Sequence, residues 1–294
     1  MQKIALNTDF VTGVGDPAPR LRLIAEAGFT HIHWCHQWNT DFLYTAPEIA
    51  AIAASFKEYG LTLLDIHGTA GVEKCWFSTV EYQRKAGVEL VRNRLEMLQE
   101  LHGEGVLMMH VPCRLMQAQD RWPLVDREFE QLKKSIDELM PVLDRYDAVI
   151  AVENMSGDTF ETISELMRDY PANRIGITYD SGHGNFTSRP VLPLLAPWKD
   201  RIEALHLHDN NGLEDQHQPP YYGNLDWEAV TDLLASAKYD RPLSFEIGMR
   251  CTPFYDAERK ADQTPKNFLR FMTDAYERCL RVVNLYEFKR KKRA

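Results

Sequence analysis

Short apolar runs alternate along the chain with longer segments in which apolar residues recur at helical spacing. The apolar runs begin near residues 3, 31, 61, 105, 148, 174, 202 and 241, and most neighbouring pairs enclose a predicted helix. The clearest helical segment is 79–102, where Val88, Val91, Leu95 and Leu98 share one face. Strands that are apolar throughout are typical of parallel sheets covered by helices. Eight such units predict an α/β protein with a (β/α)8 TIM barrel fold.

The pattern also indicates how many domains to expect. No linker or low-complexity stretch divides the 294 residues, so a single domain over 1–294 is expected. A doubly wound open sheet is the alternative fold, but no G-x-G-x-x-G or Walker loop follows any predicted strand. The basic tail at 289–294 is expected to be the solvated end of the last helix, because Lys and Arg favour a helix C-terminus.

Ionisable side chains gather at the C-terminal ends of the predicted strands. They are His67, His110, Glu153, Asp180, His183, His206, His208 and Glu246, and the loop after the seventh strand adds Asp209, Asp215 and His217. In a barrel these ends converge on one bowl, where active sites lie. Burying many ionisable groups together costs free energy unless a cation compensates them. The sequence therefore predicts a metal site, and solvated polar strand ends are the simpler alternative.

Composition restricts the compartment and the partners. The five cysteines are an odd number without a C-x-x-C pair, which favours a reduced, cytoplasmic protein. No apolar run is long enough to span a bilayer, and the first residues turn polar too early for a signal peptide, so no membrane partner is expected. The net charge of −9 would repel a phosphate backbone, so no nucleic acid partner is expected.

Several of these segments together resemble one known family. They are Val152-Glu153-Asn154, Tyr179 to His183, His206 to Asn210 with Asp215 and His217, Gly223 to Trp227, and Phe245-Glu246. The chain resembles the xylose isomerase-like barrel superfamily, which holds sugar isomerases and epimerases and also metal-dependent apurinic endonucleases. The resemblance covers nearly the whole chain. One departure is Tyr222-Gly223-Asn224, where the superfamily often has Gly-Glu-Gly.

The resemblance to the ketose 3-epimerases of that group implies one divalent ion held by Glu153, Asp180, His208 and Glu246. Such a set, rich in carboxylates, suits Mn²⁺ best and then Co²⁺, Mg²⁺ or Zn²⁺. His206 and Asp215 are candidate additional ligands. Glu153 and Glu246 would be the catalytic acid and base, moving a proton through a metal-stabilised enediolate.

The resemblance also implies a small sugar substrate and a homo-oligomer, either a dimer or a tetramer. His183 would contact a substrate hydroxyl, and His67, His110, His217 and Trp76 are further candidates for substrate binding. Three other histidines, His31, His33 and His36, are expected to be structural and partly exposed. Cys35 is expected only to fill space, because no partner for a nucleophile is evident.

Three other functions use the same residues. A lyase or dehydratase would need the same site, with loss of a β-substituent in place of reprotonation. A three-zinc apurinic endonuclease would use nine ligands, which match His67, His110, Glu153, Asp180, His183, His206, Asp215, His217 and Glu246 in order. A barrel that only binds a ligand would leave the carboxylates idle. Metal content per chain separates the three-zinc endonuclease from the enzymes that need one ion.

Overall fold

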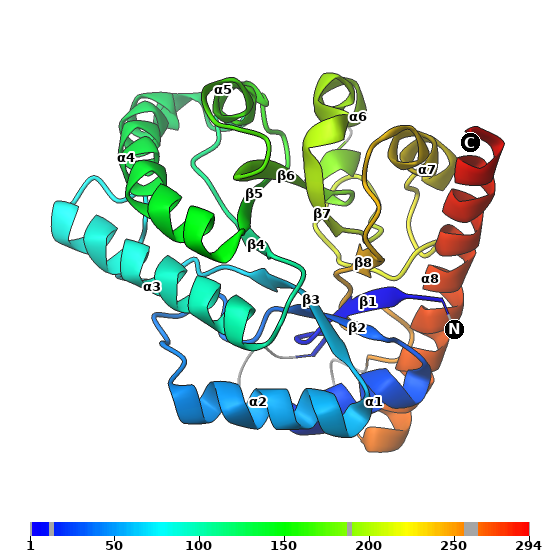
Figure 1. Ribbon diagram of the computed structural model, residues 1–294. Helices are drawn as coiled ribbons and strands as arrows, with labels where there is room; N and C mark the ends of the chain where they lie inside the picture. Colours follow the sequence, from blue (N-terminus) through cyan, green and yellow to red (C-terminus); the bar gives the residue numbers. More distant parts are fainter. Residues whose placement is uncertain (1, 12–14, 187–189, 256–263, 294) are drawn as a thin grey trace.

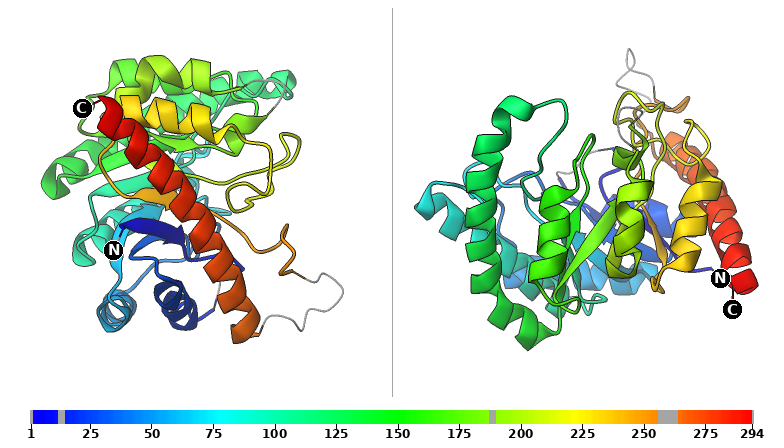
Figure 2. Two further views of the ribbon diagram at one scale, coloured as in Figure 1. Left: turned by 90° about the vertical axis from the view of Figure 1, so that its right-hand side faces the viewer. Right: turned by 90° about the horizontal axis from the view of Figure 1, so that it is seen from above.

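The predicted barrel is confirmed by a computed structural model, which describes residues 2–11, 15–186, 190–255 and 264–293. Eight parallel strands form its wall and helices surround them (Figures 1 and 2). The strands are β1 (Ile4–Asn7), β2 (His31–Trp34), β3 (Thr62–His67), β4 (Val106–Met109), β5 (Val149–Glu153), β6 (Ile175–Asp180), β7 (Ile202–His206) and β8 (Leu243–Phe245).

The helices lie outside the strands, as Figure 1 shows. They are α1 (Ala18–Ala27), α2 (Ala46–Tyr59), α3 (Glu81–Glu100), α4 (Trp122–Tyr146), α5 (Glu161–Asp169), α6 (Leu192–Leu195), α7 (Trp227–Ser236) and α8 (Pro265–Arg293). Short 3-10 helices add η1 (Gln119–Arg121), η2 (His183–Asn185) and η3 (Ala196–Arg201). None of the helices in these ranges is both long enough and apolar enough for a membrane span.

The barrel closes between β7 and β8 through few backbone contacts. The sheet order runs β7-β6-β5-β4-β3-β2-β1-β8, and a single parallel bridge, Leu207 to Phe245, joins its two ends. Leu207 N donates to Ser244 O at 3.0 Å, and Glu246 N donates to Leu207 O at 3.2 Å. The Asn7 side chain at the end of β1 accepts from Ile247 N at 2.9 Å. Glu246 therefore follows a short strand whose end is held from both sides.

The buried apolar side chains form two clusters. The large cluster joins side chains of strands and helices and contains most of the buried apolar residues. The small one contains Val106, Ala151 and Ala204, from β4, β5 and β7. Buried polar side chains are found at the carboxyl ends of the strands, among them Glu153, Asp180 and His206.

The structure defines the ends of two predicted elements. The strand that begins at residue 31 ends at Trp34, so Trp38 lies in a turn. The basic tail continues α8 to Arg293, and Ala294 lies outside the described residues. Lys289 is not free in solvent, because its Nζ lies 2.6 Å from Glu228 Oε2 and 3.2 Å from Asp232 Oδ2 on α7. The last turn of α8 thus fastens that helix to its neighbour.

Candidate metal centre

Three carboxylates and one histidine meet at the carboxyl ends of four strands. Asp180, the last residue of β6, pairs in register with His206, the last residue of β7. Glu153 ends β5 and Glu246 directly follows β8. One ligand atom from each of these four side chains lies within 4.8 Å of the others. We refer to these four residues as the central site.

Neighbouring polar residues fix the backbone around this site. The Asn154 side chain accepts from Asp180 N at 2.9 Å and donates to Asp180 O at 3.0 Å. Ser181 Oγ bonds both the N–H and the carbonyl of His208, at 2.9 and 2.8 Å. A Cβ on Gly182 would lie 1.9 Å from His208 Cε1, so only glycine leaves room for that ring. The segments Glu-Asn and Asp-Ser-Gly-His therefore tie β5, β6 and β7 together at the site.

The central site is buried and its charges interact strongly. Glu153, Asp180 and His206 are at most 1% exposed. Burial would raise the pKa of Glu153, but His206 and His110 outweigh it and hold that pKa well below its usual range. His206 lowers the pKa of Glu246 in the same way, against burial. Burial disfavours charge on His206, yet Glu246 and Glu153 raise its pKa well above the usual value.

The donor set fits a divalent cation. His206 Nδ1 contacts Glu153 Oε1 and lies 3.0 Å from Glu246 Oε2, so one imidazole faces several carboxylate oxygens. A single imidazolium cannot offset the charge of three buried carboxylates, whereas a divalent ion comes closer. His206 Nε2 and His208 Nδ1 are also buried and have no hydrogen-bond partner among the described residues. Carboxylate oxygens with one imidazole nitrogen suit Mn²⁺ and similar hard or borderline ions.

The structure places His206, not His208, in the central site as its histidine. Residues two apart share a face of a strand but stand about 6.6 Å apart along it, so they reach different depths. The register with Asp180 puts His206 at the level of the carboxylates. His208 lies one step further out, where its Nε2 is 3.0 Å from Asp180 Oδ1 and 3.8 Å from Asp215 Oδ1. Sequence spacing alone cannot tell these two positions apart.

Two further groups of candidate ligands flank the central site. One contains His67, His110 and Glu153, and the other contains His183, Asp215 and His217. His110 Nε2 lies 2.8 Å from Glu153 Oε2, and burial together with His110 lowers the pKa of His67 to about 3. Asp215 Oδ2 lies 3.3 Å from His183 Nε2 and 3.1 Å from His217 Nε2. Against burial, the Asp215 carboxylate raises the pKa of His217 to about 10.

The flanking groups are also where solvent reaches the site. The side chains of His110, His217 and Asp215 are 23%, 31% and 38% exposed, in contrast to the buried central site. Trp38 is partly exposed, and its ring centroid lies 4.6 Å from that of His67. Trp76 is only 2% exposed and donates its indole N–H to His110 O at 3.1 Å. Trp76 therefore orders the backbone of His110, and Trp38 is the partly exposed aromatic residue beside His67.

Asp209 organises the loop that carries Asp215 and His217. Its side chain is buried and accepts hydrogen bonds from Asn210 N, Tyr221 N, Leu225 N and the indole N–H of Trp227, at 2.8 to 3.0 Å. These bonds hold both ends of the long connection between β7 and α7. Asp209 counted among the candidate donors in the sequence, but its oxygens are committed to this loop.

Three residues near the site were missed by the sequence reasoning. His33 was expected to be partly exposed, but it is fully buried, and its ring centroid lies 4.3 Å from that of His206. His33 Nδ1 lies 2.5 Å from Asp65 Oδ1, and Cys35 Sγ lies 4.0 Å from Glu246 Oε1. The expectation for His31 and His36 was also wrong, since they are 5% and 7% exposed. The sequence did contain one signal for a buried polar group here, because Asp65 is a carboxylate inside an otherwise apolar strand.

Comparison with known proteins supports the fold and identifies relatives. A family model described as xylose isomerase-like TIM barrel matches residues 21–272. An uncharacterized protein of Sinorhizobium fredii, y4fM, is 31% identical over 254 residues, which cover 78% of this chain and 80% of that protein. An uncharacterized protein of Methanocaldococcus jannaschii, MJ1311, is 30% identical over 176 residues, covering 56% of this chain and 58% of its own length.

Solved structures with the same fold have low sequence identity to this chain. A D-tagatose 3-epimerase-like protein aligns over 100% of both chains with a TM-score of 0.69 and 21% identity. A D-psicose 3-epimerase solved in the presence of D-fructose aligns over 94% of this chain and 97% of its own, with a TM-score of 0.71 and 16% identity.

The role of Asp209 can be tested by replacing it with asparagine. Asp209→Asn keeps the size but places an amide donor against N–H groups, so buried donors lose their acceptor. We expect the free energy of unfolding to fall by about 3 kcal/mol in urea denaturation. Asp226→Asn is the matched control, because Asp226 caps α7 through Ala229 N at 3.0 Å and asparagine caps equally well. Equal stability of the two variants would contradict this role.

Proposed function

Since the chain belongs to the xylose isomerase-like TIM barrel family, we propose that it is a divalent-metal-dependent isomerase or epimerase of a sugar or sugar derivative. The observation that carries the proposal is the convergence of Glu153 and Glu246, from different strands, on one buried group with Asp180 and His206. The names of the structural neighbours, which include ketose 3-epimerases, favour the same class of reaction.

The proposed ligands of the ion are Glu153, Asp180, His206 and Glu246, with Mn²⁺ preferred over Co²⁺, Mg²⁺ and Zn²⁺. When bound, the ion would stabilise negative charge that develops on a substrate oxygen as the neighbouring carbon loses a proton. His208, the ligand expected from the sequence, would instead orient Asp180 through its contact at 3.0 Å.

Glu153 and Glu246 are the proposed acid and base. They come from β5 and β8, with β6 and β7 between them in the wall, so they approach a substrate from different sides. One carboxylate can remove a proton from carbon while the other returns it to the opposite face, which inverts the configuration. Transfer by one residue between adjacent carbons would give isomerisation, and loss of a β-substituent would give a lyase.

The opening of the site suits a small polyhydroxylated molecule. His183, His217 and Asp215 offer hydrogen-bonding groups on one side, and His67 and His110 do so on the other. Trp38 presents a partly exposed ring on which the apolar face of a sugar can stack.

We further propose that the protein is cytoplasmic, in keeping with five free cysteines, and that it forms a dimer or tetramer.

A second candidate is a three-metal phosphodiester hydrolase of the apurinic endonuclease type. It is favoured by one observation: the nine residues matched to that pattern fall into the central site and two flanking groups, with Glu153 shared by the central site and one flanking group. The acidic net charge of −9 opposes it, because a nucleic acid substrate would be repelled.

The number of bound ions separates the two candidates. We expect elemental analysis of the purified protein to find about one divalent ion per chain that exchanges for Mn²⁺. Asp215→Asn should leave that number unchanged, because Asp215 lies outside the central site. Three tightly held zinc ions per chain, reduced in number by Asp215→Asn, would overturn the one-ion proposal and support the hydrolase.

Replacing each proposed acid or base tests the proton-transfer step. Glu153→Gln and Glu246→Gln keep an oxygen donor but remove the base, so turnover on an active sugar should fall by ~10²–10⁴-fold. For an epimerase, solvent deuterium should still enter from the face that keeps its carboxylate, as measured by mass spectrometry. Glu89→Gln, at a 70% exposed position on α3, is the control. Wild-type turnover in both active-site variants would remove this mechanism.

A further inference from the structure

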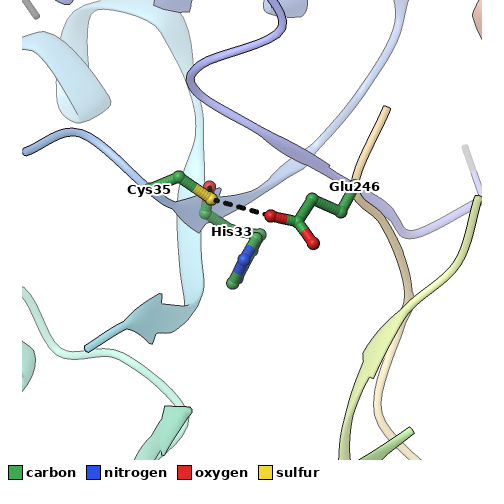
Figure 3. Close-up of side chains that lie close together, drawn as sticks. All are labelled: His33, Cys35 and Glu246. Carbon is green, nitrogen blue, oxygen red and sulfur yellow. Dashed lines mark hydrogen bonds between the residues drawn. The ribbon is translucent and has the colours of Figure 1, made fainter. Parts of the chain in front are cut away.

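A fourth group of candidate ligands lies beside the central site and contains a thiol. His33 and Cys35 come from β2 and the residue after it, and Glu246 follows β8. One ligand atom from each lies within 4.8 Å of the others, and all three residues are buried. Figure 3 shows the three side chains turned toward one another. His33 and Cys35 are not among the residues matched to either function proposed above.

Asp65 prepares His33 to be a ligand. The Asp65 carboxylate lies 2.5 Å from His33 Nδ1, which fixes the proton on that nitrogen and leaves the lone pair on Nε2. His33 Nε2 is buried and has no hydrogen-bond partner within residues 2–11, 15–186, 190–255 and 264–293. In metal sites, a carboxylate commonly accepts a hydrogen bond from one imidazole nitrogen of a histidine ligand. The other imidazole nitrogen of that histidine binds the ion.

The two carboxylate oxygens of Glu246 face different neighbours, one in the central site and one beside Cys35. Its Oε2 lies 3.0 Å from His206 Nδ1 in the central site, and its Oε1 lies 4.0 Å from Cys35 Sγ. The Cys35 side chain is fully buried, its sulfur also lies 3.9 Å from His33 O, and the Asp9 side chain is a further hydrogen-bond partner. Nitrogen, sulfur and oxygen donors of these three residues therefore lie close together beside the central site.

We propose that His33 Nε2, Cys35 Sγ and Glu246 Oε1 bind a second, thiophilic divalent ion of the Zn²⁺ class, and that Glu246 bridges it to the central site. One imidazole, one thiolate and one carboxylate form a donor set typical of zinc, with a fourth position left for water. The S–H bond of Cys35 breaks as the sulfur–metal bond forms, and the proton leaves to solvent. The inference depends on the proposed function only in sharing Glu246.

An ion in this position would act directly on the proposed acid and base. Coordination of Oε1 would hold the Glu246 carboxylate in place and lower its tendency to accept a proton. A thiophilic ion bound by His33 and Cys35 therefore gives the protein a route by which such an ion controls turnover.

Cobalt absorption tests the site through a signal that only a thiolate ligand produces. The full-length, Mn²⁺-loaded protein is titrated with Co²⁺, and the near-ultraviolet thiolate-to-cobalt charge-transfer band is recorded. We expect a band that saturates at one Co²⁺ per chain, disappears in Cys35→Ser and persists in Cys279→Ser. Cys279 is the matched control, because it is fully buried on α8 and belongs to no group of candidate ligands among the described residues.

The outcomes separate this proposal from the central site. Circular dichroism and retained Mn²⁺ are the controls for the folding of Cys35→Ser; with both unchanged, loss of the band reports on the ligand. Absence of the band in the wild-type protein, or its persistence in Cys35→Ser, would overturn the thiophilic site. Failure of every protein to hold Mn²⁺ while the band remains would instead refute the central site.

Discussion

The structure depends on keeping three carboxylates together in a buried place. Glu153, Asp180 and Glu246 are each at most 8% exposed, and one oxygen of each lies within 4.8 Å of the others. Like charges at this distance, away from water, repel strongly unless positive charge lies between them. Without an ion, a protonated His206 supplies part of that charge through its contacts with two of the carboxylates. The proposed divalent ion would replace the proton on His206 Nδ1 and bring more positive charge to the same place.

The barrel meets this requirement because its parallel strands all end at the same rim. Asn154 and Ser181 link β5, β6 and β7 by side-chain to backbone bonds, so Asp180 and His206 keep their register. Glu246 is placed by the short contact between β7 and β8 and by Asn7 from β1. Asp209 then secures the loop that brings Asp215 and His217 to the opening. The proposed catalytic groups are thus positioned with the help of hydrogen bonds to the backbone, a rigid arrangement that would suit proton transfer.

The fold and the general place of the site could be predicted because both follow from local patterns. Apolar runs and helical spacing identify the repeating units, and polar residues at strand ends follow directly from them. The choice between His206 and His208 could not be made, since it depends on the register between β6 and β7. His33 and Asp65 lie on neighbouring strands, and nothing in sequence shows that they pair across 2.5 Å. Trp38 and Trp76 both follow predicted strands, and only the folded structure shows that Trp76 is buried whereas Trp38 is partly exposed.

The central claim is that one ion binds between Glu153, Asp180, His206 and Glu246. Crystals grown with Mn²⁺ as the sole divalent ion and measured at a wavelength where manganese scatters anomalously would locate it directly. The account predicts one strong anomalous peak in contact with oxygens of all three carboxylates and with His206 Nδ1, with His208 outside its coordination sphere. A principal peak bound by His208, or one held by His183, Asp215 and His217 with none at the central site, would contradict it.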